Sequence, residues 1–166
     1  MIKRLFNFIL PFFREVYLYE SKKNKKSVSF NNYFLQKYRS KKFIKNNIIE
    51  KYLETGNKED RFKRNQTLFV LFFKKKAVCF GWMNKNSTWK ITEINKIIYK
   101  KKTFILYDFF TPPNLRNKGL YTKILNLIKN IKTKNKFLIY CLKTNISSRK
   151  GIIKSKFTLV EKMKGF

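Results

Sequence analysis

The run from Thr103 to Phe110, followed closely by Pro112-Pro113, is the feature that most limits how this chain can fold. Its β-branched and aromatic side chains predict a strand, and the two prolines, which lack N–H groups, prevent that strand from continuing as a paired one. A basic loop that contains Gly119 comes next, and 120–131 carries apolar residues at helical spacing. A strand, a glycine loop and a helix must therefore follow one another directly. The N–H groups at the start of such a helix can hold a phosphate.

Further strand and helix patterns surround this unit. Strand patterns cover 12–19, 67–73, 77–83, 137–142 and 158–162, and helix patterns cover 28–56, as two helices broken near Arg39-Ser40, and 147–154. Residues 67–73 and 77–83 are joined by three lysines and predict a hairpin, whereas the pattern of 88–99 is ambiguous. This order predicts a single α/β (α+β) domain over 1–166.

Composition excludes disorder and several kinds of catalytic chemistry. Hydrophobic residues make up 43% of the chain, too many for a disordered basic tail even at a formal net charge of +31. The charge either marks an anionic partner or reflects a bias toward lysine codons, and in both cases it would attract an anionic cofactor. The chain has no histidine, which excludes a Ser-His-Asp or Cys-His constellation and a histidine-bearing zinc site, so we expect no metal. The two cysteines, Cys79 and Cys141, are expected to be buried, inert thiols.

The first thirteen residues have a basic start and a short apolar run. They lack the small-residue cleavage site of a signal peptide and are too short to span a bilayer, so a cytoplasmic protein is expected. A buried strand or helix is the first interpretation of this segment, and peripheral membrane contact is the alternative.

Two motifs resemble those of the GNAT acetyltransferases. Arg116-x-x-Gly119-x-Tyr121 resembles the pyrophosphate loop Arg/Gln-x-x-Gly-x-Gly/Ala, with Tyr121 at the final small position. The segment from Asn145 to Phe157 resembles the family's Asn-x-x-Ala/Ser…Lys-x-Gly-Phe helix and turn, with Lys156 in place of glycine. The resemblance covers 61–160 well and 1–60 poorly. The amino-acid sequence around the loop also resembles that of family members from surface-polysaccharide gene clusters.

The resemblance implies a mixed, mostly antiparallel sheet flanked by helices, with acetyl-CoA as co-substrate. It implies an N-acetyltransferase that transfers the acetyl group directly to an amine of a small molecule or amino sugar. The family uses backbone N–H groups of the loop for the pyrophosphate, the preceding strand for the pantetheine arm, and the following strand splays away to leave the slot. The cofactor-binding residues expected here are Phe109, Phe110, Thr111, Arg116, Asn117, Lys118, Gly119, Leu120, Tyr121, Asn145 and Ser148.

Candidate acid and base residues are few. Between Arg61 and Val160 the acidic residues are Glu93 and Asp108, so a carboxylate base in this region is one of these two. In a regular strand Asp108 shares one face with Leu106 and Phe110, which predicts an apolar surround that would raise its pKa. The alternative for both is an ion-paired or solvated carboxylate.

The family often protonates the CoA thiolate with a tyrosine on the last helix, and that position is Ile152 here. Tyr121, Tyr140 or water could take its place.

Two other functions compete with the acetyltransferase. One is a basic nucleic-acid-binding protein with exposed aromatic residues such as Tyr38, Phe43 and Trp89. The other is a GNAT-like scaffold that has lost catalysis and binds a partner, as the departures at Tyr121, Ile152 and Lys156 would allow.

Overall fold

The structure, a computed structural model, describes residues 14–21, 28–40, 58–131 and 136–165. Its strands are β1 (Glu15–Ser21), β2 (Tyr33–Tyr38), β3 (Thr67–Phe73), β4 (Lys76–Asn84), β5 (Thr88–Ile91), β6 (Lys96–Tyr99), β7 (Thr103–Phe110), β8 (Lys136–Leu142) and β9 (Phe157–Lys164). Its α-helices are α3 (Lys58–Lys63), α4 (Leu120–Lys129) and α5 (Ile146–Lys154), with short 3₁₀ turns η3 (Thr92–Ile94) and η4 (Pro113–Leu115).

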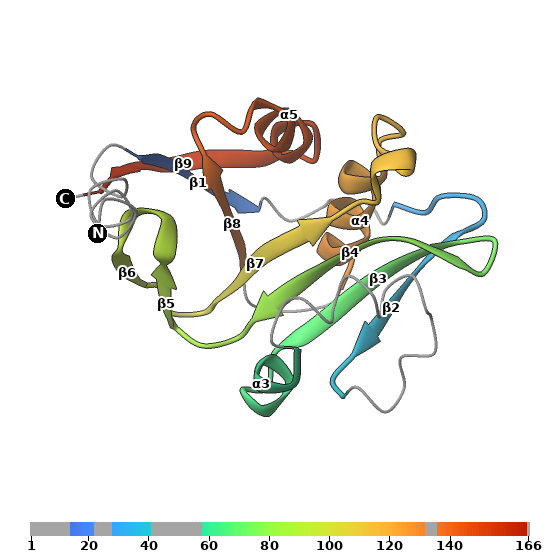
Figure 1. Cartoon of the computed structure of the whole chain (residues 1–166), viewed down its shortest axis with the longest axis horizontal. Helices are drawn as coiled ribbons and strands as arrows, with labels where there is room; N and C mark the ends of the chain where they lie inside the picture. Colours follow the sequence, from blue (N-terminus) through green and yellow to red (C-terminus); the bar gives the residue numbers. More distant parts are fainter. Residues whose placement is uncertain (1–13, 22–27, 41–57, 132–135, 166) are drawn as a thin grey trace, which may run out of the picture.

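Seven strands form one sheet in the order β2-β3-β4-β7-β8-β1-β9, and β5 and β6 form a separate hairpin (Figure 1). The strand neighbours in the large sheet are antiparallel, except for β7 and β8. These two strands pair in parallel, and α4 connects them in the sequence. The predicted mixed, mostly antiparallel α+β fold is confirmed, as are the β3–β4 hairpin, the β7 strand and the α4 helix.

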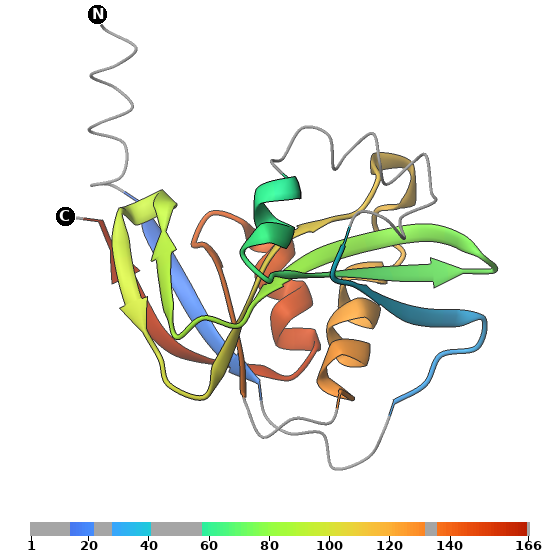
Figure 2. The same cartoon turned by 90° about the horizontal axis from the view of Figure 1, so that it is seen from below.

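Helices α4 and α5 cover one face of the sheet, and α3 lies on the other (Figure 2). Ile124 and Ile128 of α4 and Ile152 of α5 pack against Tyr17 and Tyr19 of β1 in the first face's core. On the opposite face α3 packs beside β3 and β4, and the β5–β6 hairpin packs over the start of β7. The side chains of β1 alternate between the two cores, since Val16 and Leu18 join the core below the hairpin whereas Tyr17 and Tyr19 join the core under the helices.

The helix predicted at the start of 28–56 is wrong, because Tyr33 to Tyr38 form the edge strand β2 against β3. Phe34 stacks on Phe72 on one face of the sheet, at 4.9 Å between ring centroids, while Tyr33 packs on Phe73 on the other, at 4.7 Å. Apolar residues on both faces conceal the two-residue alternation that marks a strand. The second predicted helix and the segment 1–13 lie outside the described residues.

Among helices in the described ranges, none combines the length and apolar character needed to cross a membrane.

Candidate active site

The β7 and β8 strands separate halfway along their length. They pair in parallel register from Thr103↔Lys136 to Leu106↔Ile139, and the register of the described residues stops there. Beyond this point β7 stays paired with β4 and β8 stays paired with β1. The facing edges of Tyr107–Phe109 and Tyr140–Leu142 therefore leave backbone N–H and C=O groups pointing into the gap. This separation confirms the predicted splay between the two strands.

A β-bulge lies on β7 at the place where the strands separate. Phe80 pairs with Phe110 and Trp82 with Tyr107, so Asp108 and Phe109 together oppose Gly81. Asp108 has a φ of 46°, in the left-handed region, and such a residue breaks the side-chain alternation of a strand. The Phe109 ring lies over Gly81, where an added Cβ atom would come within 2.3 Å of it.

The bulge overturns the prediction that Asp108 lies in an apolar surround. Its side chain is 57% exposed, and its carboxylate pairs with Arg61 of α3 at 2.5 Å. The guanidinium of Arg61 lies over the rings of Trp82 and Tyr107, 5.1 and 5.2 Å from their centroids. Asp108 is thus an ion-paired carboxylate at the rim of the gap, held by an arginine that two aromatic faces position.

The gap holds a cleft of about 200 Å³ that brings all three candidate catalytic residues together. It is lined by Glu93, Tyr107, Asp108, Phe109, Tyr121, Ile139, Tyr140, Cys141, Leu142, Asn145 and Ser148. Asp108, Glu93 and Tyr121 reach it from β7, η3 and α4, and four of the expected cofactor-binding residues also line it.

The other expected cofactor-binding residues lie beyond the cleft lining, at the end of β7 and along the loop that follows. Thr111 donates its hydroxyl to the Cys79 sulfur at 3.3 Å, and Arg116 Nε donates to the Thr111 carbonyl at 3.2 Å. The Leu120 side chain is buried in the core, so only its backbone can face a ligand.

Gly119, the residue directly before α4, has a left-handed conformation with φ of 68°, and no side chain caps the helix there. The Lys123 N–H is bonded to the Gly119 carbonyl, at 3.0 Å, as the first turn of the helix requires. The N–H groups before it have no acceptor within an α-helix, which leaves them available to an anion. The space at Gly119 is open, since an added Cβ atom would have Lys123 Nζ as a neighbour at 3.7 Å.

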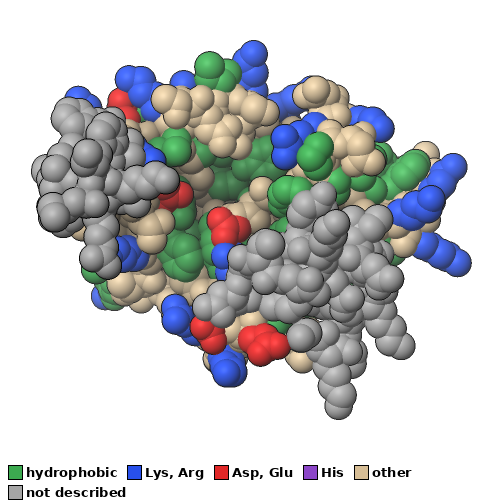
Figure 3. All heavy atoms as spheres, in the orientation of Figure 1, with side chains coloured by type: hydrophobic (Ala, Val, Ile, Leu, Met, Phe, Trp, Pro, Cys, Tyr) green, Lys and Arg blue, Asp and Glu red, His purple; other side chains and the backbone are tan. Residues whose placement is uncertain are grey.

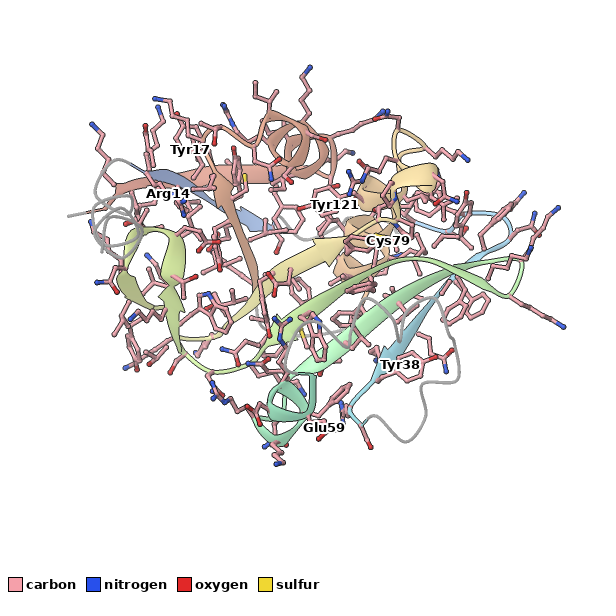
Figure 4. All side chains as sticks on the ribbon, in the orientation of Figure 1. Arg14, Tyr17, Tyr38, Glu59, Cys79 and Tyr121 are labelled. Atoms are coloured by element: carbon pink, nitrogen blue, oxygen red, sulfur yellow. The ribbon has the colours of Figure 1, made fainter. Side chains whose placement is uncertain are left out.

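Tyr121, where the resembled family has a small residue, is accommodated by a glycine on the facing helix. An added Cβ atom at Gly151 of α5 would lie 2.6 Å from the Tyr121 ring. On its other side Tyr121 meets the Phe109 ring edge-on, at 5.3 Å between centroids. Figure 4 shows Tyr121 beside Cys79, and burial together with the nearby thiols raises the pKa of the Tyr121 hydroxyl well above its ordinary value.

An aromatic wall closes the other side of the cleft. The rings of Trp89 and Tyr107 pack 4.5 Å apart, and Trp89 Nε1 donates to the Tyr140 hydroxyl at 3.3 Å. The Tyr107 hydroxyl donates to the Gln66 side chain. Sequence patterns missed Arg61, Tyr107 and the position of Trp89, because α3 and the β5–β6 hairpin reach this wall only through tertiary packing.

Three further expectations are settled by burial. Ile152 is fully buried in the core, so α5 offers no side chain for proton transfer at that position.

Tyr38 is buried and Trp89 is packed against Tyr107, so neither is the exposed stacking aromatic residue that a nucleic-acid-binding protein would use. Phe43 lies outside the described residues. Burial raises the pKa of the Cys79 thiol to about 12 and that of Cys141 to about 11, and Cys141 is only half-buried in the cleft wall.

Comparisons with known proteins rest on structure alone, since no protein-family model and no curated protein matches this sequence. A conserved protein of unknown function from Staphylococcus epidermidis superposes with a TM-score of 0.60 at 9% identity, over 90% of this chain and 59% of the other. A GNAT-family acetyltransferase from Colwellia psychrerythraea gives 0.54 at 14% identity, over 89% and 53%. A proposed GNAT-family acetyltransferase from Novosphingobium aromaticivorans gives 0.56 at 9% identity, over 90% and 61%.

This chain therefore spans between half and two thirds of the length of these neighbours. At such low identity the likeness concerns the fold. The chain has the fold seen in GNAT-family acetyltransferases.

Proposed function

We propose that the protein is an acetyl-CoA-dependent N-acetyltransferase whose acceptor is an amine of a small molecule or amino sugar. The observation that carries the proposal is the separation of β7 from β8 directly before the loop at Gly119. A strand edge with free backbone groups then leads to a helix start with free N–H groups. An extended thioester arm that ends in a pyrophosphate matches these two features in that order.

Acetyl-CoA would lie along the free edge of β7, with its pyrophosphate at the N–H groups of 117–121. The open space at Gly119 fits that placement, because a side chain in this conformation would be strained and would stand at the helix start. Asn145, which caps α5 by accepting from the Ser148 N–H at 3.0 Å, would line the opposite wall. The cofactor site would thus lie within 61–160, as the sequence resemblance implies.

The reaction requires the acceptor amine to lose a proton and attack the thioester carbonyl. Asp108 or Glu93 would take that proton, and N–H groups on the free edge of β7 would stabilise the oxyanion that forms. Collapse of this intermediate forms the amide and releases the CoA thiolate.

Tyr121 would then protonate the thiolate. A tyrosine hydroxyl carries its proton at neutral pH and can donate it, and burial, which raises the pKa of Tyr121, makes it a weaker acid than an exposed tyrosine. This assignment gives the cleft an acid although the corresponding position on α5 is the buried Ile152. A surface-polysaccharide role, with an amino sugar as acceptor, is proposed from the sequence around the loop.

Calorimetry with acetyl-CoA and with CoA tests the proposal. We expect saturable binding of both in the micromolar range, and no heat at high micromolar ligand would refute it. Binding without turnover of any amine would instead support the catalytically inactive scaffold.

Turnover of two variants then separates the candidate bases. Asp108→Asn and Glu93→Gln remove one carboxylate each and should leave acetyl-CoA binding unchanged. The variant that has lost the base should lose roughly 100-fold or more in kcat. A kcat equal to that of the unaltered protein would remove the altered residue as base.

A further inference from the structure

The cleft has the opposite charge character to the rest of the protein. The chain has 40 lysines and arginines against 9 acidic residues. Among the residues that the structure describes, the cleft lining nevertheless contains Glu93 and Asp108 and no lysine or arginine. In Figure 3 acidic side chains lie beside the hydrophobic centre of the face shown, and others lie near its edge among lysines and arginines. A bias toward lysine codons cannot produce this arrangement, because it adds positive charge wherever side chains are solvated.

The two carboxylates differ in their partners. Asp108 is neutralised by Arg61, whereas Glu93 forms no ion pair with any residue in the described ranges. Its carboxylate accepts a hydrogen bond from the hydroxyl of Thr92, at 3.2 Å. Glu93 is also held in place, because its neighbour Ile94 is buried in the core under the hairpin. The cleft therefore presents one positioned carboxylate that is not neutralised by an ion pair within the described part of the chain.

The surround of Glu93 suits a cationic group. The Glu93 and Asp108 carboxylates both lie close enough to the Tyr140 hydroxyl to add to the effect of burial in raising its pKa. The Tyr140 side chain lines the same cleft, and aromatic rings attract ammonium groups. A carboxylate beside an aromatic ring binds an organic cation better than a neutral or anionic ligand.

We infer that the acceptor carries a second positive charge besides the amine that is acetylated, as a diamine or polyamine does, and that Glu93 selects it. This inference rests on the proposed acetyl transfer and names its substrate class. One amine would lie at the thioester and lose its proton to Asp108, the other candidate base, while the second stays protonated and pairs with Glu93. An acceptor with a carboxylate at the second position would be repelled.

Three amines of one chain length test this selection. In 1,4-diaminobutane, 1-aminobutane and 4-aminobutyrate the second group is cationic, neutral and anionic respectively. Each is titrated by calorimetry into the full chain saturated with CoA, and KM and kcat are measured with acetyl-CoA. We expect the diamine to bind at least tenfold more tightly than 1-aminobutane, and 4-aminobutyrate to bind most weakly.

Glu93→Gln should reduce the affinity for the diamine to that for 1-aminobutane, and should raise KM for the diamine while leaving the affinity for 1-aminobutane unchanged. The matched control is Glu161→Gln, which removes an exposed carboxylate of β9 that pairs with Lys100 and lies outside the cleft lining. This control should keep the preference for the diamine.

Equal or weaker binding of the diamine, or a preference that survives Glu93→Gln, overturns the inference. Failure of the proposed function is distinguishable, because CoA binding is measured first in the same preparation. A protein that binds CoA and ignores the second charge remains an acetyltransferase candidate with another acceptor.

Discussion

At the scale of single residues, Lys156 stands in a conformation that favours glycine. Its φ is 60°, in the turn between α5 and β9, where the resembled motif has glycine. A residue with a Cβ atom is strained there by about 1 kcal/mol or more. The departure from the motif therefore leaves the backbone turn in place and only adds strain to it.

Lys156→Gly should raise the free energy of unfolding by about 1 kcal/mol, measured by urea denaturation. Lys150→Gly is the control, because Lys150 is exposed in the interior of α5 and glycine there should lower stability by about 1 kcal/mol. Equal effects of the two substitutions on the free energy of unfolding would show that the backbone conformation of Lys156 does not strain the protein.

Gly151 and Tyr121 form a second residue-scale unit. An added Cβ atom at Gly151 would lie 2.6 Å from the Tyr121 ring, so Gly151→Ala should lower the free energy of unfolding by about 1–3 kcal/mol. In a Tyr121→Ala background the same change should raise it by about 0.5–1 kcal/mol, because alanine is the better helix former.

Urea denaturation of the single and double variants measures this reversal of sign. A Gly151→Ala effect of the same sign and size in both backgrounds would show that the ring and the glycine do not compensate each other.

At the scale of elements, the start of α4 should decide whether the cofactor binds. Gly119→Trp places a large side chain at a φ of 68° in front of the helix N–H groups and should abolish acetyl-CoA binding in calorimetry. Lys102→Trp is the matched control, since Lys102 has a φ of 54° and is exposed before the opposite end of β7. The Lys102→Trp variant should bear similar backbone strain and keep its affinity for acetyl-CoA. Loss of binding in both variants would point to unfolding instead.

The elements around the site differ in how well the sequence predicts them. The unit of β7, the Gly119 loop, α4, β8 and α5 is predicted closely, because each element has a strong local pattern and Pro112-Pro113 mark the end of β7. The β2 strand is missed because apolar residues face both sides of it and its partner β3 lies a long way along the chain. The short helix α3, which supplies Arg61 to the site, has too few residues to show a period.

The environment of Asp108 was also missed, because it depends on a partner strand that the local sequence pattern does not show. A regular strand places Asp108 on the face of Leu106 and Phe110, and the bulge opposite Gly81 turns it out to Arg61. A bulge depends on the partner strand, so strand alternation alone could not reveal it. The sequence therefore identified Asp108 as a residue of the site, but it did not reveal that Asp108 is exposed and paired with Arg61.

At the scale of the whole molecule, the net charge of +31 should make acetyl-CoA binding sensitive to salt. The phosphates of the cofactor are attracted by the summed charge, and salt screens this attraction over a length of about 10 Å at 0.1 M. The calorimetric Kd should rise several-fold between about 50 and 300 mM salt. Pantetheine, which lacks the phosphates, is the control and should bind independently of salt. Equal salt sensitivity of both ligands would contradict a role for the charge in cofactor attraction.

The location of bound CoA tests the central claim most directly. An assigned amide NMR spectrum of the full chain, recorded with and without CoA, reports which N–H groups a ligand approaches. We predict the largest changes at 117–122 and at the free edge of β7, from Tyr107 to Phe109. Changes confined to lysine-rich surface turns such as Lys74–Lys76, with the loop and strand edge unaffected, would contradict a CoA site between β7 and β8.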